Sequence, residues 1–402
     1  MMKVAVIGAG AAGFFAALSV RQHHPQSEVT IFEKSNKLLS KVKISGGGRC
    51  NVTNACFNVA DLVLNYPRGG MQLKKAFPVF NVKDTIEWFE SRGVKLKTEP
   101  DNRMFPVTDN SQSVVDCLLN EAERMKIKIQ INRPIVSIQK KEDRFILKLN
   151  NDDALHADKI IVATGGSPKK ESYEWLKELG HEIIPPVPSL FTFNIPGSKI
   201  TKLMGVSSEH ALVRIQGTKL KQEGPLLITH WGMSGPAVLK LSAFGAKILN
   251  EMNYHFKINV NWNATTNEQA LREIIQHELK NISRKKISNH KLINLPSRLW
   301  NFLTVKSEIN PEVNWGVSKE KMNKLINTLT NDEYEIKGKT TFKEEFVTCG
   351  GVSLQTIDFS TMQSKVCSGM YFAGEVMDID GITGGFNFQA AWTTGFIAGK
   401  LK

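Results

Sequence analysis

The sequence predicts an α/β fold whose core is a parallel sheet, and three stretches of the chain support this prediction. A glycine-rich turn follows a short apolar run at residues 3–7, and a second apolar run ends in glycines at residues 158–166. The third stretch, from residue 370 onward, is a strand, a glycine loop and a helix. Short apolar strands that lead directly into glycine turns are typical of parallel α/β sheets.

The N-terminal turn has the clearest pattern of the chain. The run KVAVI at residues 3–7 is followed at once by GAGAAG and then by a helical pattern. Gly8 permits the tight turn, Gly10 lets the backbone approach a pyrophosphate, and Gly13 lets the helix pack on the strand. The N-terminus of that helix offers N–H groups to phosphates. Glu33 ends the next strand, where its carboxylate can accept hydrogen bonds from ribose hydroxyls, so the stretch predicts a dinucleotide site.

Both FAD and NAD fit this turn, and the C-terminal segment favours FAD. A strand at residues 370–373 leads into Gly374 and Glu375, then into a glycine loop and a helix from about Phe386. This order resembles FAD enzymes of the glutathione-reductase-like superfamily, in which the acid lies near the ribitol or pyrophosphate. In those enzymes the next helix points its N-terminus at the flavin, where its dipole stabilises the negative charge of the reduced ring. In related folds the strand that contains Ile135 contacts the adenine through its backbone.

The stretch SGGGRCNVTNAC at residues 45–56 lies where enzymes of this superfamily approach the flavin ring. Disulfide reductases have two cysteines there with four residues between them, whereas five separate Cys50 from Cys56. The intervening NVTN is typical of a turn, which disfavours a redox dithiol. No further Cys or His lies nearby in the sequence, so we expect no metal. The glycines instead predict a backbone cradle, with Arg49 and Asn51 as donors.

Composition limits the possible classes of protein. The chain has 402 residues, of which 41% are hydrophobic and 23% are charged, as in ordinary globular proteins. It contains no apolar run of about 18 residues, so we expect no membrane span. Five cysteines are too few for a secreted disulfide framework and favour a cytoplasmic location. The net charge is +13, and residues 272–306 hold eight Lys and Arg against two Glu. Such a run is typical of a solvated helix face, with a polyanion-binding surface as the alternative.

Five blocks along the chain together resemble one family. They are KISGGGRCNVTN, DNRMFPVTDNSQSVVDCL, LITHWGMSGPAVLKLS, VTCGGVSLQTIDFSTMQSK and YFAGEVMDIDGITGGFNFQAAWTTG. In this order they are similar to the BaiN/YhiN-type flavoproteins, also known as the aminoacetone-oxidase family of FAD-binding enzymes. The resemblance implies non-covalent FAD in a discontinuous Rossmann-like domain, with an insert made of a β-barrel-like part and a small helical domain. Carried over by motif position, the implied FAD contacts are Gly8, Gly10, Ala12, Gly13, Glu33, Lys34, Ser45, Gly46, Gly47, Arg49, Cys50, Asn51, Gly165, Gly374, Glu375, Asp380, Gly385, Asn387 and Phe388.

The domain boundaries follow from composition and pattern. A proline-rich segment at residues 187–199 marks the start of the insert, and a strand pattern near Val347 marks the return to the first domain. We therefore expect the FAD-binding domain at 1–190 and 346–402, and the insert at 191–345. Within the insert, strand patterns at 191–264 and 331–345 fit the β-barrel-like part, and helical patterns at 265–330 fit the helical bundle.

The polar candidates for catalysis outside the cofactor motifs are His230, in THWGMSGP, and Arg103, in DNRMFP. A histidine can relay a proton, and an arginine can hold a carboxylate or keto oxygen. The alternatives are a packed turn histidine and a structural ion pair. A second GxGxxG unit is missing from the sequence, so we expect no dedicated NAD(P) domain, although NAD(P)H can still reduce the flavin by docking transiently over the ring.

Three functions remain open at this point. The first is an FAD-dependent oxidoreductase that acts on a small molecule, as an oxidase, dehydrogenase or reductase, with the flavin as hydride carrier. The second is a flavoenzyme that acts on tRNA, motivated by the basic insert. The third is a non-catalytic flavin-binding regulator. The first function needs neither a nucleic acid nor a membrane as partner.

Overall fold

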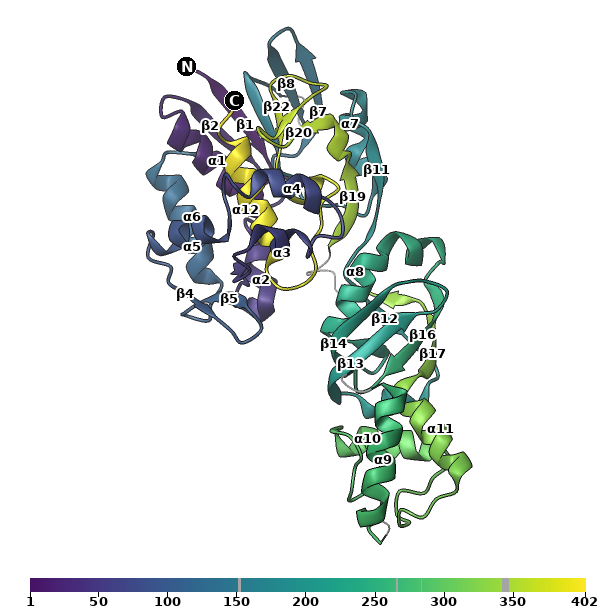
Figure 1. Cartoon of the computed structure of the whole chain (residues 1–402). Helices are drawn as coiled ribbons and strands as arrows, with labels where there is room; N and C mark the ends of the chain where they lie inside the picture. The colour runs from purple at the N-terminus through teal and green to yellow at the C-terminus, as the bar shows by residue number, and fades with distance from the viewer. Residues whose placement is uncertain (151–152, 265–266, 283, 342–346) are drawn as a thin grey trace. The chain divides into compact units, whose positions relative to one another are not determined.

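The computed structural model describes residues 1–150, 153–264, 267–282, 284–341 and 347–402 (Figure 1). The chain forms two compact units, which are Met1–Pro188 with Lys343–Lys402, and Ser189–Phe342. We call the first the nucleotide unit and the second the insert unit. The expected return to the first domain at residue 346 lies outside the described residues.

A seven-stranded sheet forms the centre of the nucleotide unit. Five neighbouring strands, β6, β2, β1, β10 and β22, run parallel to one another. The strand β1 comes from the N-terminal end of the chain and β22 from the C-terminal end, so both ends contribute to one sheet. The strand β1, the middle one of these five, has neighbours on both sides, and its apolar residues are buried, as the predicted α/β class requires. The strands, in spatial order, are β6 (Lys128–Gln130), β2 (Glu28–Phe32), β1 (Lys3–Ile7), β10 (Lys159–Val162), β22 (Met370–Phe372), β21 (Gln363–Ser364) and β20 (Ile357–Asp358).

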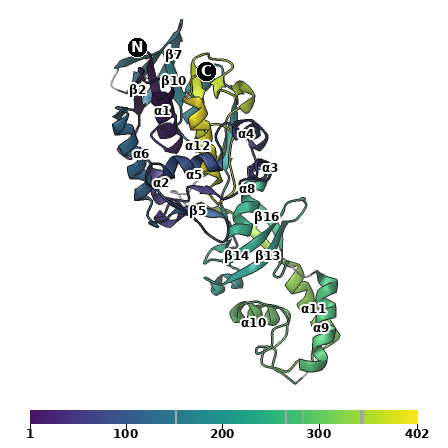
Figure 2. The same ribbon diagram turned by 60° about the vertical axis from the view of Figure 1, so that its left-hand side comes forward.

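Two helices, α1 (Ala11–His23) and α12 (Phe386–Ala398), lie side by side in this unit (Figures 1 and 2). Both are apolar on nearly every face, which is typical of a helix buried on all sides. They approach closely because Gly395 has no side chain, and a Cβ there would lie 2.6 Å from the Ala12 carbonyl oxygen. Phe15 of α1 packs between Trp88 and Trp392, with ring centroids 4.5 and 4.7 Å away.

Shorter elements surround this centre. An antiparallel meander is formed by the strands β7 (Ile135–Lys141), β8 (Arg144–Leu149) and β9 (Ala154–Ala157). The other strands of the unit are β3 (Thr53–Asn54), β4 (Leu96–Thr98), β5 (Arg103–Pro106), β11 (Ile183–Pro188) and β19 (Thr348–Val352). Its other helices are α2 (Ser40–Gly48), α3 (Val59–Val63), α4 (Gly70–Ala76), α5 (Val82–Glu90), α6 (Gln112–Arg124), α7 (Glu174–Glu178), and the 3₁₀ turns η1 (Lys170–Tyr173), η3 (Leu354–Thr356) and η4 (Gly374–Val376).

The insert unit is an antiparallel sheet with helices. Alternating burial along β13, β16 and β17 shows that one sheet face covers the core, and Trp262 and Trp300 are among its largest buried side chains. The strands, in spatial order, are β17 (Asp332–Lys337), β16 (His255–Asn261), β13 (Ser207–Ile215), β14 (Lys221–Ile228), β15 (Gly232–Ser234), β12 (Thr192–Asn194) and β18 (Lys339–Thr340). The helices are α8 (Pro236–Glu251), α9 (Glu268–Ile282), α10 (Ser297–Lys306), α11 (Lys319–Thr330) and the 3₁₀ turn η2 (Lys199–Leu203).

Helix α8 was not expected, because it lies inside residues 191–264, where we predicted strands. Pro236 occupies its first turn, a position that suits proline because the missing N–H would have no helical partner there. Its apolar residues recur at helical spacing and pack on β13 and β14. Over the described part of the chain, no helix is both long and apolar enough to cross a membrane.

Candidate functional site

The first glycine turn lies at the carboxyl edge of the parallel sheet. Gly8 has a φ of +109°, and its N–H donates to the Phe32 carbonyl across 2.8 Å. A Cβ on Gly8 would lie 2.3 Å from the Ala163 carbonyl oxygen, and one on Gly13 would lie 1.9 Å from the Gly8 carbonyl oxygen. These two glycines therefore let β1, β10 and α1 approach one another, as the dinucleotide pattern predicts.

Two other glycines of this edge face open space. A Cβ on Gly10 or on Gly165, whose φ is +73°, would meet no atom within 4 Å. Gly10 is the N-cap residue of the thirteen-residue helix α1, and no side chain caps that helix. Uncapped N–H groups at a helix N-terminus, beside backbone without side chains, fit a pyrophosphate. This edge of the sheet therefore fits the nucleotide that the sequence predicts.

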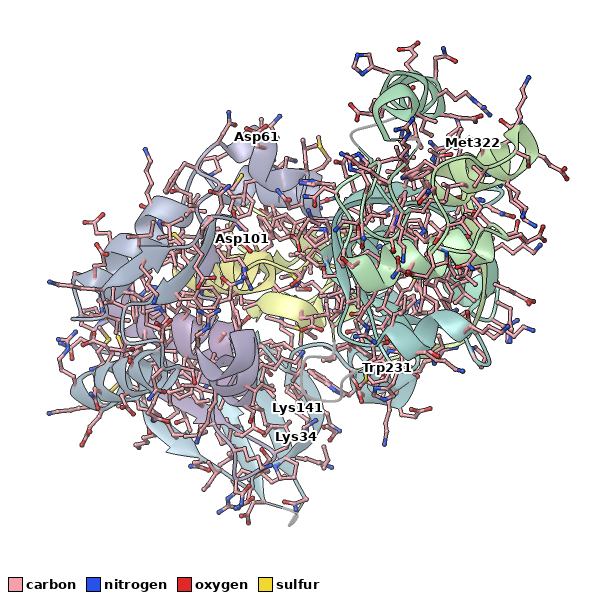
Figure 3. The ribbon with its side chains drawn as sticks, turned by 90° about the horizontal axis from the view of Figure 1, so that it is seen from below. Lys34, Asp61, Asp101, Lys141, Trp231 and Met322 are labelled. Carbon is pink, nitrogen blue, oxygen red and sulfur yellow. The ribbon has the colours of Figure 1, made fainter. Side chains whose placement is uncertain are left out.

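Glu33 follows β2 and lies against the same turn. Its carboxylate accepts hydrogen bonds from the Ala9 N–H at 3.1 Å and from the N–H and hydroxyl of Ser35 at 3.0 and 2.9 Å. These bonds fix the carboxylate beside the turn, where its remaining lone pairs can accept from a ribose. The neighbouring Lys34 is exposed, and Figure 3 labels it.

The second glycine loop, at residues 45–48, interrupts α2 with non-helical backbone. Gly46, Gly47 and Gly48 have φ values of +59°, +70° and +85°, and Ser45 is extended. A Cβ on Gly46 would lie 2.7 Å from the Phe105 ring, whereas Gly47 and Gly48 have no neighbour within 4 Å. One side of the loop is therefore packed and the other is open, which fits the predicted cradle.

The two cysteines near this loop have different surroundings. Cys50 is fully buried with a φ of +63°, and burial raises the pKa of its thiol to about 12. The thiol therefore stays protonated at neutral pH and is a poor nucleophile. Cys56 is partly exposed beyond β3, burial raises the pKa of its thiol too, and both cysteines are free. This arrangement supports the cradle over a redox dithiol.

The C-terminal acid, Glu375, also reaches the carboxyl edge. Its carboxylate accepts from Lys41 Nζ at 2.8 Å and from the Thr348 N–H at 2.9 Å. A Cβ on Gly166 would lie 2.5 Å from Glu375 Oε1, and a Cβ on Gly374 would lie 2.8 Å from that of Ala12. The segments that follow β1, β10 and β22 thus converge, and they bring Ala12 beside Gly374 and Glu375 beside Gly166, the neighbour of Gly165.

Polar side chains near the start of α12 form hydrogen bonds and an ion pair with other groups of the protein. The Asn51 amide oxygen accepts from the Gly385 N–H at 2.9 Å when the amide is oriented to satisfy its neighbours. The Asn387 amide exchanges two hydrogen bonds with the backbone of Gly381, and Phe388 stacks on Trp392. The Asp380 carboxylate is fully buried and ion-paired with Arg68. The side chains of Asn51, Asp380 and Asn387 therefore shape the loop and are engaged by protein partners.

The two predicted arginines converge on Glu99. Arg49 pairs with Glu99 at 2.6 Å, and its guanidinium lies 3.9 Å from the centre of the Phe105 ring. Arg103 pairs with Glu99 at 3.3 Å and with Asp101 at 2.6 Å (Asp101 is labelled in Figure 3). These contacts favour a structural ion pair over a substrate-binding role for Arg103. They also place Arg49 behind the packed side of the second glycine loop.

Two further predicted residues belong to β7, which follows Arg133 and its hydrogen bond from N–H to the Glu33 carbonyl oxygen at 2.9 Å, and to the insert unit. Ile135 begins β7 and is partly exposed. His230 is exposed in the turn between β14 and β15 of the insert unit, and its ring lies edge-on to Trp231 at 4.1 Å between centroids. Trp231 itself is labelled in Figure 3 and donates to the Thr192 hydroxyl at 2.9 Å.

Sequence reasoning missed Lys41, Thr348 and Glu99. Lys41 and Thr348 hold the Glu375 carboxylate, and Glu99 holds both arginines. Thr348 precedes a glycine pair in the fourth family block, so its position gave a usable signal. Lys41 and Glu99 carried none, because a charged residue among many other charged residues acquires a partner only through the fold.

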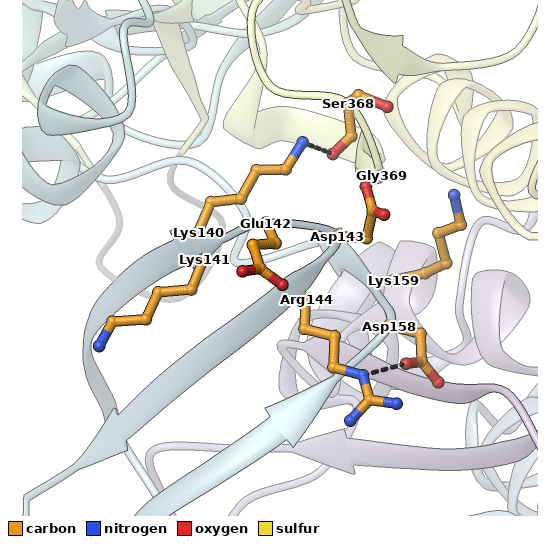
Figure 4. Close-up of a pocket in the computed structure, with 9 residues that line it drawn as sticks. All are labelled: Lys140, Lys141, Glu142, Asp143, Arg144, Asp158, Lys159, Ser368 and Gly369. Carbon is orange, nitrogen blue, oxygen red and sulfur yellow. Dashed lines mark hydrogen bonds and ion pairs between the residues drawn. The ribbon is translucent and has the colours of Figure 1, made fainter.

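A hollow of about 680 Å³ lies at the other end of the nucleotide unit's sheet (Figure 4). Asp158 and Lys159 stand at the start of β10, and Gly369 precedes β22, so the hollow is at the amino edge. Its walls mix four cations with three acids, and Arg144 pairs with Asp158 at 3.4 Å. Ligands of parallel α/β sheets bind outside the carboxyl ends of the strands, so this hollow is not the nucleotide site. Metal-binding groups of three or more His, Cys, Asp or Glu do not occur among the described residues.

Comparison with known proteins agrees with this geometry. The family described as HI0933-like protein Rossmann domain matches residues 2–401. The chain is 28% identical to a ribosomal RNA dihydrouridine synthase of Haemophilus influenzae, covering 97% of this chain and 96% of the relative. It is 26% identical to a 3-dehydro-bile acid delta(4,6)-reductase of Clostridium scindens, covering 100% and 98%. The solved 3-ketosteroid delta1-dehydrogenase of Sterolibacterium denitrificans has the same overall fold, with a TM-score of 0.52, 11% identity and 99% coverage of each chain.

Proposed function

Because the chain belongs to the HI0933-like Rossmann family and is an FAD-dependent oxidoreductase, we propose that it reduces a carbon–carbon double bond conjugated with a carbonyl group. We propose further that this bond belongs to a uracil of ribosomal RNA. The observation that carries the reaction type is the agreement of two relatives over nearly the whole chain. The names of both, dihydrouridine synthase and delta(4,6)-reductase, describe the reduction of such a bond.

In this proposal the open glycines hold the cofactor. The N–H groups at the start of α1, with Gly10, take the pyrophosphate, and Glu33 takes the ribose. Gly47 and Gly48 approach the ring of the flavin, which supplies a hydride when bound and reduced. The hydride adds to one carbon of the double bond and a proton adds to the other. NAD(P)H docking transiently over the ring is the proposed two-electron donor.

The proton donor that we propose is His230. It is exposed, so it can reach a substrate, and an imidazole can act as a general acid. Arg103 stays a weaker candidate for holding a carbonyl oxygen, because Glu99 and Asp101 already pair with it.

RNA is favoured as the substrate by the charge of the protein. The net charge of +13 and the basic insert suit a polyanion, and the relative from Haemophilus influenzae is named for ribosomal RNA. The expected small-molecule substrate remains a second candidate, supported by the bile-acid reductase of Clostridium scindens. A tRNA substrate stays a prediction that no observation favours over ribosomal RNA.

A single comparison of substrates tests the proposal. The holoenzyme, reduced anaerobically with NADH, NADPH or dithionite, is mixed with unmodified ribosomal RNA, with tRNA or with an unsaturated 3-oxo steroid. We expect reoxidation of the flavin and dihydrouridine in the ribosomal RNA, measured by nucleoside mass spectrometry. Reoxidation by the steroid alone would assign the second candidate function, and reoxidation by none of the three would contradict the reaction type.

A further inference from the structure

The charge of the protein is distributed unevenly between its two units. The insert unit holds 21 Lys and Arg against 12 Asp and Glu, and the nucleotide unit holds 31 against 27. Most of the net charge of +13 therefore belongs to the insert unit, although this unit is the shorter one. An excess of one sign on one unit attracts ligands of the opposite sign.

Three cations of the basic segment at residues 272–306 pair with carboxylates. Arg272 pairs with Glu268 at 2.7 Å and Lys286 pairs with Glu312 at 3.1 Å. Lys306 pairs with Asp332. Charges that are paired in this way contribute little to the field around the protein. Arg272, Lys286 and Lys306 are therefore weak candidates for binding a polyanion.

Three other cations gather on η2 and α10. Lys199 and Lys202 are three residues apart on the 3₁₀ turn η2, so their side chains leave the turn on the same side. Arg298, in the first turn of α10, donates from Nη2 to the Lys202 carbonyl oxygen at 3.1 Å. All three residues are exposed, and none forms an ion pair with a carboxylate in the part of the chain that the structure describes. We call these three residues the η2 patch.

Such an arrangement lowers stability unless an anion joins it, because like charges held close together repel each other. The hydrogen bond to Lys202 uses one of the five guanidinium N–H groups of Arg298, so the others can donate to an anion. A guanidinium binds phosphate oxygens in pairs, and ammonium groups add point charges beside it. Met204, which is 57% exposed, adds apolar surface next to η2.

We infer that the η2 patch binds the phosphate backbone of the RNA substrate. The identity of this polyanion rests on the proposed function. The patch supplies affinity that does not depend on sequence, because phosphates are the same along any strand. It is thus a docking surface within the insert unit, distinct from the residues that hold the cofactor.

The test compares two holoenzyme variants of equal charge change. One carries Lys199→Ala, Lys202→Ala and Arg298→Ala, and the control carries Lys83→Ala, Lys95→Ala and Lys126→Ala, which remove three lysines of the nucleotide unit. Binding of an unmodified ribosomal RNA transcript is measured from low to high salt. For the η2 variant we expect the slope of log K against log salt to fall by about three, one for each lost phosphate contact. The affinity at 0.1 M salt should fall on the order of 100-fold.

The control variant should keep the slope and affinity of the wild type, and thermal melts should show that both variants fold. Equal slopes for the η2 variant and the wild type would overturn the inference. Equal losses in both variants would overturn it as well, because net charge alone would then explain binding. Preference of the wild type for phosphatidylserine vesicles over RNA would also overturn it.

The same variants separate this inference from the proposed function. If the proposed function is correct but the η2 patch does not bind RNA, the η2 variant forms dihydrouridine in the transcript at the wild-type rate when the RNA concentration is below saturation. If the patch holds and the function does not, RNA binding depends on the patch but no dihydrouridine forms with any variant. If both hold, the η2 variant loses activity at low RNA concentration and regains it near saturation.

Discussion

The two glycine loops of the nucleotide unit use the same residue for opposite purposes. In the first loop Gly8 and Gly13 are enclosed by backbone, and Gly10 faces open space. In the second loop Gly46 is packed on Phe105, and Gly47 faces open space. Each loop therefore has glycines that hold the protein together and glycines that leave room for a ligand.

This difference implies that folding and cofactor binding can be separated by substitution. A side chain on an enclosed glycine must displace backbone, which lowers the stability of the fold. A side chain on an open glycine of allowed φ leaves the fold intact and fills the space of the ligand. The sequence motif treats all these glycines alike, and only the structure divides them.

The largest effect is expected for Gly13→Val, compared with Gly10→Val. A Cβ on Gly13 would lie 1.9 Å from a backbone oxygen, so we expect a loss of about 3 kcal/mol or more in the free energy of unfolding. Gly10 has an extended backbone and an open neighbourhood, so the apoprotein of Gly10→Val should melt near the wild-type temperature and bind FAD poorly. Thermal melts and flavin content measure both effects. Similar melting temperatures for the two apoproteins would show that the division into enclosed and open glycines is wrong.

Gly47→Val should mainly weaken FAD binding. Its φ of +70° strains a valine by about 1–3 kcal/mol, and the side chain fills the open side of the loop. The matched control is Gly93→Val, because Gly93 is exposed with a φ of +85° and open space, and it lies in the turn after α5 and in neither glycine loop. Both variants should lose similar stability, but only Gly47→Val should raise the Kd for FAD, by about tenfold or more as followed by flavin fluorescence. An equal Kd in the two variants would remove Gly47 from the site.

Glu33→Ala should weaken FAD binding by about 1.5–3 kcal/mol for each ribose hydrogen bond lost, because the acceptor is charged. Ser35→Ala is the control, since it removes one internal hydrogen bond of the carboxylate and leaves the charge in place. The retention of flavin on dilution measures the effect. Full retention by Glu33→Ala would contradict its assignment.

The smallest effect is expected for Cys50→Ser and Cys56→Ser. The thiol of Cys50 is protonated, so it carries no electrons to the flavin, and flavin reduction and turnover should persist in both variants. Cys50→Ser can shift the flavin spectrum, since it changes a buried group near the cradle. A thiolate-to-flavin charge-transfer band in the wild type that disappears in either variant would support the dithiol instead.

The sequence predicted the strands of the parallel sheet, the glycine turns and the position of Glu33 at the end of a strand, because each depends on residues close together in the chain. The α/β class, the Rossmann-like domain and the family are confirmed. It did not predict that Asp380 pairs with Arg68, or that Glu99 holds Arg49 and Arg103, because these partners meet only after folding. Nor did the sequence show that Arg272 and Lys306 of the basic run pair with Glu268 and Asp332, which lie outside it.

The central claim is that FAD binds at the carboxyl edge of the sheet, between the open sides of the two glycine loops. Hydrogen–deuterium exchange of the apoprotein and the FAD-loaded protein tests it directly. We expect FAD to protect the amides around Gly10, at Gly47 and Gly48, and at Gly165, and to leave the tip of the β7–β8 hairpin at residues 140–144 unchanged. Protection of the hairpin and of the hollow beside Lys140 and Lys159, with no change in the glycine loops, would contradict it.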